Sequence, residues 1–165
     1  MLYLSRIKDI QFRDKGGNDN RMNGNNPNLK AFTVIFRAYQ SIQDATKKDL
    51  MKYGLNQTEF GVLEFLYHRG EQPIQVLGKR ILIASSSITY VVDKLEEKGF
   101  VCRRSCPNDR RVTYAVLTSE GQLLMERIFP AHEQKINEIF EVLTEKEVET
   151  MIGALKKVGI NATKK

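Results

Sequence analysis

The feature that most constrains this chain is one change of hydrophobic period in a sequence that otherwise has the spacing of helices. Apolar residues recur at three- and four-residue steps over most of the length, as on the buried side of an amphipathic helix. Between residues 100 and 117, two short runs typical of strands flank Pro107-Asn108-Asp109, which is a turn signal. The sequence therefore predicts a mainly α-helical fold with a small β-hairpin.

Helices are expected on both sides of this hairpin, and their ends carry local signals. A capping-box pattern, a polar residue followed three positions later by Glu, opens helices at Asn56 and Thr144. Thr118 should cap the long helix after the hairpin, and Pro130 should kink it because proline removes a backbone donor. The expected helices span Leu29 to about Lys52, Asn56 to Arg69, Ile74 to about Ile81, Ser85 to Lys98, Thr118 through Phe140, and Thr144 to Val158, with Gly54, Gly99 and Gly159 as stops.

Positive charge is concentrated in one quarter of the chain. The net charge is +6, and residues 74–114 carry eight basic side chains against four acidic ones. Such asymmetry is typical of a segment that meets a polyanion, although a solvated basic surface would give the same count.

The helix from Ser85 to Lys98 has the two sides expected of a helix that enters a DNA groove. The order helix, short helix, helix, hairpin is that of a winged helix-turn-helix, whose recognition helix lies in the major groove beside the hairpin. Small hydroxyl side chains let a helix backbone approach base edges, and a lysine suits a phosphate, although a serine-rich start is also a good N-cap. The residues expected to face DNA are Ser86, Ser87, Thr89, Tyr90 and Lys94, opposite an inner side of Ile88, Val91, Val92 and Leu95.

These residues resemble the MarR family of bacterial winged helix-turn-helix transcriptional regulators. The stretch Ser87–Gly99 is similar to the family's recognition helix, and Asp109-Arg110-Arg111 followed by Leu117-Thr118 is similar to its wing signature. The resemblance implies that Arg111 enters the minor groove while Asp109 holds the arginine side chains. The neighbouring basic residues Arg103, Arg104 and Arg110 are expected to contact phosphates.

The resemblance also implies an obligate homodimer, in which the first helix and the last two helices interlock. The residue pattern agrees, because three long amphipathic helices flank a module of about 90 residues, more apolar surface than so small a module can cover. We therefore expect a winged helix-turn-helix with N- and C-terminal dimerisation helices. The expected segments are a flexible leader at 1–27, an N-terminal dimerisation helix at 28–55, a winged helix-turn-helix DNA-binding region at 56–117 and C-terminal dimerisation helices at 118–160.

The leader has a composition with little to bury, since Gly, Asn and Asp dominate residues 13–28. Lys15-Gly16-Gly17 can be encoded by a purine-rich run of the kind that precedes a bacterial start codon, and Met22 follows shortly afterwards. We therefore expect that translation could begin at Met22, in which case residues 1–21 would not be native.

Composition and motifs exclude several classes of protein. No apolar run approaches the ~18 residues of a membrane span, and the charged N-terminus lacks the apolar segment of a secretory signal, so a cytoplasmic location is expected. The sequence has no P-loop, dinucleotide fingerprint, nucleophile elbow or metalloprotease helix, so we expect no catalytic residues and no cofactor. Two cysteines and two histidines are a weak signal for zinc, and no metal site is expected.

The two cysteines differ in their predicted surroundings. Cys102 alternates along a strand and is expected to be buried as a small apolar residue. Cys106 lies at the hairpin turn near several arginines, which favour the reactive thiolate. A disulfide between them is disfavoured because four extended residues span ~13 Å. Oxidation of Cys106 would add bulk or charge where DNA must approach.

The sequence thus predicts a dimeric, sequence-specific regulator that binds double-stranded DNA at a pseudo-palindromic operator, acts as a repressor and responds to a small-molecule effector or stress. The alternatives are a regulator that senses oxidants or electrophiles through Cys106, a winged helix used for protein contact without DNA binding, and an enzyme with a helix-turn-helix accessory. In the family, effector sites usually lie between the dimerisation helices and the DNA-binding lobe. Candidate lining residues, each equally compatible with core or surface, are Phe32, Phe36, Tyr39, His68 and His132.

Overall fold

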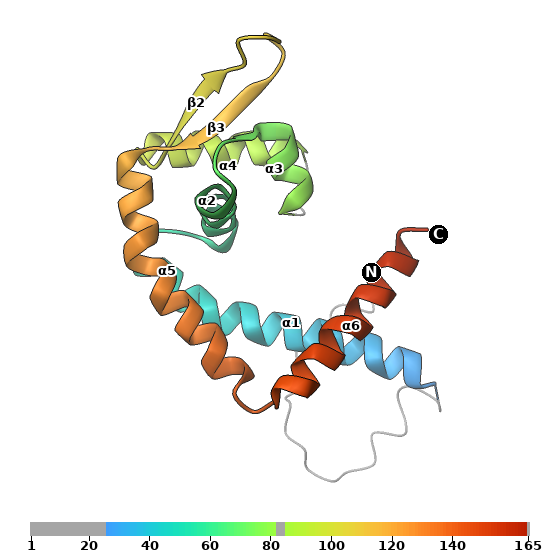
Figure 1. The fold of residues 1–165 in the computed structure, drawn as a ribbon. Helices are drawn as coiled ribbons and strands as arrows, with labels where there is room; N and C mark the ends of the chain where they lie inside the picture. The colour runs from blue at the N-terminus through green and yellow to red at the C-terminus, as the bar shows by residue number, and fades with distance from the viewer. Residues whose placement is uncertain (1–25, 82–84, 165) are drawn as a thin grey trace, which may run out of the picture. The chain divides into compact units, whose positions relative to one another are not determined.

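The computed structural model describes residues 26–81 and 85–164 of the chain, so the expected leader before residue 26, with Met22, lies outside the described residues. The chain consists of two compact units, residues 1–40 and residues 41–165. In order, the elements are α1 (Pro27–Met51), α2 (Gln57–Arg69), β1 (Gln72–Pro73), α3 (Ile74–Arg80), α4 (Ser85–Glu97), β2 (Val101–Ser105), β3 (Thr113–Leu117), α5 (Ser119–Phe140) and α6 (Glu145–Ala162) (Figure 1). The first unit contributes the beginning of α1, and the second contains the rest of the fold.

The helix starts predicted from local pattern are confirmed. The Asn56 side chain accepts from the backbone N–H of Glu59, and the Glu59 carboxylate accepts from the N–H of Asn56, both at 2.9 Å. Thr144 and Glu147 form the same reciprocal pair at the start of α6, and the Thr118 hydroxyl accepts from a backbone N–H of α5.

Two helices continue through residues that were expected to interrupt them. Gly159 does not end α6, which continues to Ala162, because a glycine with an ordinary helical backbone lowers helix stability without stopping the helix. α5 continues through Pro130 as one helix, so the kink expected there stays a prediction.

The predicted hairpin is present, and it belongs to a three-stranded sheet of order β1-β3-β2. β2 and β3 pair antiparallel from Val101 opposite Leu117 to Ser105 opposite Thr113. The two residues of β1 pair with β3, Gln72 with Ala115 and Pro73 with Tyr114. We did not predict β1, since two residues are too few to show a period, and its proline is tolerated because the strand lies at an edge.

The core of the second unit lies between α2, α3, α4, the start of α5 and the sheet. The inner side of α4 is buried as predicted, and α2 and α4 contribute four buried apolar residues each to this core. Fully enclosed side chains include Val62, Leu63, Leu66, Leu77, Val92, Leu95, Val101 and Met125. This packing anchors α4 from behind and leaves its opposite side to solvent. No helix within the described ranges combines the length and apolar character needed to cross a membrane.

Candidate nucleic-acid interface

The outward side of α4 presents small hydroxyl groups followed by an aromatic and a basic residue. Ser87 and Thr89 are exposed, and the Tyr90 side chain is 62% exposed. The side chain of Ser86 lies outside the described residues. Lys94 donates to Glu97 at 2.6 Å, which raises the pKa of the ammonium, and its Nζ lies 5.8 Å from the centre of the Tyr90 ring.

Arg103 connects β2 to α4 rather than projecting into solvent. Its guanidinium donates to the carboxylates of both Asp93 and Glu96, and its backbone N–H donates to Glu96 at 3.1 Å. Burial disfavours the charge, but the two carboxylates outweigh it and raise the pKa of Arg103. Arg103 therefore fixes the wing to α4, and its side chain is only 27% exposed. Its contact with phosphate stays a prediction.

Arg104, the next residue of β2, forms an ion pair with Glu71, just before β1. Its side chain is more than half exposed, so the pair adds little to stability. The pair still holds the guanidinium toward the β1 side of the sheet.

At the wing turn the structure brings Asp109 and Arg111 together. The Asp109 carboxylate accepts from the backbone N–H and Nε of Arg111, both at 3.0 Å, and from its Nη2 at 3.1 Å. The hydrogen bond from the Arg111 side chain, followed by the one from its backbone, lowers the pKa of Asp109. Arg111 is thus held in one orientation while its side chain stays 90% exposed, which suits insertion into a groove.

Three basic residues of this region have no ion pair among the described residues. Arg110, for which the sequence predicts a phosphate contact, is one of them. Lys79 and Arg80, at the end of α3, are exposed and were counted only as part of the basic segment. All four acidic residues of segment 74–114 pair with basic residues of that segment, which a charge count does not reveal: Asp93 and Glu96 with Arg103, Glu97 with Lys94, and Asp109 with Arg111.

The two cysteines differ in how well their predicted surroundings agree with the structure. Cys102 is exposed, so its predicted burial is wrong, because Val101 rather than Cys102 occupies the inward register of β2. Cys106 is half-buried, and its backbone N–H donates to Val112 across the hairpin at 3.0 Å. A redox role for Cys106 stays a prediction.

The two histidines pack against aromatic rings. His132 lies 4.4 Å from the Phe60 ring centre, and His68 meets Phe129 edge-on at 4.7 Å. Among the described residues, no group of three or more His, Cys, Asp or Glu side chains is arranged to hold a metal ion.

These elements define a winged helix-turn-helix protein whose recognition helix and wing are tied together by one arginine. The chain belongs to the MarR family of transcriptional regulators, whose sequence profile matches residues 55–113. Over 134 residues it is 54% identical to the HTH-type transcriptional regulator MhqR of Bacillus subtilis (strain 168), covering 81% of this chain and 92% of that protein.

Solved structures agree in fold. Sco3205, a MarR family regulator from Streptomyces coelicolor in complex with DNA, superposes with a TM-score of 0.75 at 25% identity, covering 79% of this chain and 84% of that one. A point mutant of MarR from E. coli complexed with operator DNA gives a TM-score of 0.73 at 25% identity, covering 81% and 96%. The protein is therefore a DNA-binding transcriptional regulator and not an enzyme.

Proposed function

We propose that the protein is a homodimeric repressor that binds a pseudo-palindromic operator in the cytoplasm and is released by a small-molecule or stress signal. The observation that carries the proposal is the exposure of α6. This amphipathic helix has no buried residue in the isolated chain. Its exposed apolar residues are Ile152, Leu155, Val158 and Ile160.

An amphipathic helix is stable in a folded protein when its apolar side is covered. A second copy of the chain is the covering partner we propose, since regulators that bind DNA through this fold usually pair two half-sites by twofold symmetry. The first unit shows the same property, because Phe32 and Tyr39 on α1 are 66% and 57% exposed.

The DNA contacts we propose are made by α4 in the major groove and by Arg111 in the minor groove. Ser87, Thr89 and Tyr90 would lie against base edges, and Lys94 with Arg110 against phosphates. Two features support this, the exposed hydroxyl side of α4 and the arginine of the wing that Asp109 holds in place. Two such modules should recognise half-sites centred about one helical turn (~10 bp) apart.

The test is selection of duplexes from a random pool by the purified protein, followed by footprinting and affinity measurement over a range of salt. Lys94 and Arg110 of two protomers give a log–log slope of about −4, whereas adding Arg103 and Arg104 would give about −7. We expect a slope between these values and a symmetric footprint. An affinity independent of salt, or a pool without enrichment, would contradict the proposal.

A further inference from the structure

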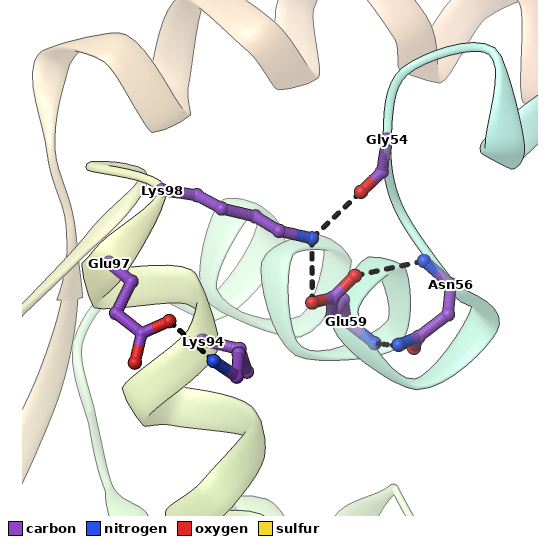
Figure 2. Close-up of polar contacts among 6 residues, drawn as sticks. All are labelled: Gly54, Asn56, Glu59, Lys94, Glu97 and Lys98. Carbon is purple, nitrogen blue, oxygen red and sulfur yellow. Dashed lines mark hydrogen bonds and ion pairs between the residues drawn. The ribbon is translucent and has the colours of Figure 1, made fainter.

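Behind the DNA-facing side of α4, one lysine joins segments that are far apart in the sequence. Lys98 follows the last residue of α4, and its Nζ donates to the backbone oxygen of Gly54 and to Oε1 of Glu59, both at 2.7 Å (Figure 2). Gly54 lies in the turn after α1, and Glu59 lies in the first turn of α2. The end of the recognition helix is thereby attached to the α1–α2 junction.

Glu59 uses both carboxylate oxygens, for two different purposes. Oε2 accepts from the N–H of Asn56 and completes the cap of α2, while Oε1 accepts from Lys98 (Figure 2). Glutamine serves as well as glutamate in a capping box, so the cap alone does not require a charge. A glutamate side chain that is only 6% exposed does require a counter-charge for its carboxylate, and Lys98 supplies it.

Gly54 contributes through its backbone conformation. Its φ of +68° lies in the left-handed region, where a side chain would be strained. With this turn fixed, the carbonyl reaches the same ammonium as Glu59, so two of the three donors of Lys98 are used. The Lys94–Glu97 pair, also on α4, is separate from this arrangement (Figure 2).

We propose that Glu59 and Lys98 are positioning residues for operator recognition. Together with Gly54 they form a set of three residues, Gly54, Glu59 and Lys98, which we call the bracket. The bracket sets the orientation of α4 relative to the α1–α2 junction. Because α1 is a proposed dimerisation helix, the bracket determines how well the two recognition helices match one half-site spacing. This inference rests on the proposed function.

The experiment uses the full-length protein and three probes: the duplex that the parent protein selects, the same duplex with one base pair inserted between half-sites, and an unrelated duplex of equal length. Glu59→Gln keeps the cap and removes the charge, and Lys98→Met keeps the stem and removes the ammonium. The double variant leaves neither charge unpaired, so it should fold even if Lys98→Met does not.

Each variant should lose affinity for the selected duplex by about tenfold, a typical size for coupling through a packed network. Discrimination against the inserted base pair should weaken, while binding to the unrelated duplex and the salt slope should not change. The double variant should be no worse than either single variant, because both remove the same contact. Asn56→Ala is the control, since it weakens the cap and leaves the bracket, so it should lower stability and preserve spacing preference.

Several results would overturn the bracket. Parent-like affinity and spacing preference in Glu59→Gln would show that the pair does not position α4. Weaker binding of Lys98→Met alone, with a smaller salt slope on both duplexes, would make Lys98 a phosphate contact. Equal losses of affinity for the selected and the unrelated duplex would indicate that Glu59 and Lys98 only stabilise the fold. If the parent enriches no duplex, the proposed function fails, and the bracket fails with it.

Discussion

At the scale of single residues, the arginines of the candidate interface differ in how many of their N–H groups already donate to carboxylates of the protein. Arg103 donates to two carboxylates and is mostly covered, whereas Arg111 donates to Asp109 alone and is almost fully exposed. A guanidinium has five N–H donors, so each hydrogen bond to a carboxylate of the protein leaves fewer donors for DNA. Arg111 is pre-oriented yet accessible, which makes it the arginine whose loss should affect binding most directly.

Replacing Arg111 by Ala should weaken operator binding by about 1–3 kcal/mol and leave the proposed dimer intact. Asp109→Asn should have a smaller effect, because the amide oxygen still accepts one hydrogen bond while the charge attraction is lost. Titration of labelled operator measures both variants, with sedimentation as the control for assembly. Unchanged affinity in Arg111→Ala would refute the wing assignment.

The same pair predicts how binding responds to pH. Arg111 lowers the pKa of Asp109, so this carboxyl loses its charge only below its ordinary value of 3.8. The Asp109–Arg111 ion pair therefore stays intact at every pH above the lowered pKa of Asp109. The attraction is lost only as the pH falls through that pKa. Between about pH 5 and 8, Asp109→Asn should thus change operator affinity by a constant factor.

At the scale of elements, the corner where β3 passes into α5 is closely packed against the end of α4. Thr118 donates its backbone N–H to Phe100 at 3.1 Å and its hydroxyl to Gly99 at 2.6 Å. A Cβ added to Gly121 would lie 2.1 Å from the backbone oxygen of Phe100. A glycine is required here because the backbone of Phe100 comes too close to leave room for a side chain. The φ of Gly121 is not in the left-handed region, so backbone conformation is not the reason.

Gly121→Ala should therefore destabilise the fold by about 1–3 kcal/mol, because the added Cβ would clash with backbone atoms that cannot rotate away. Gly61→Ala is the matched control within α2, since its Cβ would meet only the Ile81 side chain at 3.9 Å. It should be neutral or stabilising by up to about 1 kcal/mol. Urea unfolding at one fixed protein concentration measures both, and equal midpoints would refute the packing argument.

The features that sequence alone could predict are those whose partners lie close along the chain. Asn56 and Glu59, or Thr118 and the start of α5, are within three residues of each other, so their pattern indicates the cap directly. Arg103 meets Asp93 across a turn, and Lys98 meets Glu59 at a separation of 39 residues. Such contacts depend on tertiary packing, which hydrophobic period does not specify, and the exposure of Cys102 depends likewise on strand register.

At the scale of the whole molecule, the proposed dimer decides whether two recognition helices act together. α6 carries no buried residue, and its apolar side includes Leu155 at 41% exposed and Val158 at 60% exposed. A dimer that covers this side would make folding and assembly depend on the same surface. Operator binding would then depend on α6 although no residue of α6 is proposed to touch DNA.

Leu155→Glu should convert the proposed dimer to a monomer in sedimentation experiments, because two like charges would be buried across a twofold interface. Operator affinity should fall strongly, since the half-sites would then be bound independently. Lys157→Gln changes the charge by the same one unit on a different side of α6 and should leave both properties unchanged. A dimeric Leu155→Glu protein would place the interface elsewhere.

The division of α4 into a buried side and an exposed side has a consequence for how such regulators diversify. Ile88, Val92 and Leu95 hold the helix in the core, while Thr89 and Tyr90 are exposed. After gene duplication, substitutions on the exposed side could change the operator with little effect on folding. If the proposed dimer forms, the two gene products would still share their dimerisation helices, so mixed dimers would form and bind hybrid operators until α6 also diverged.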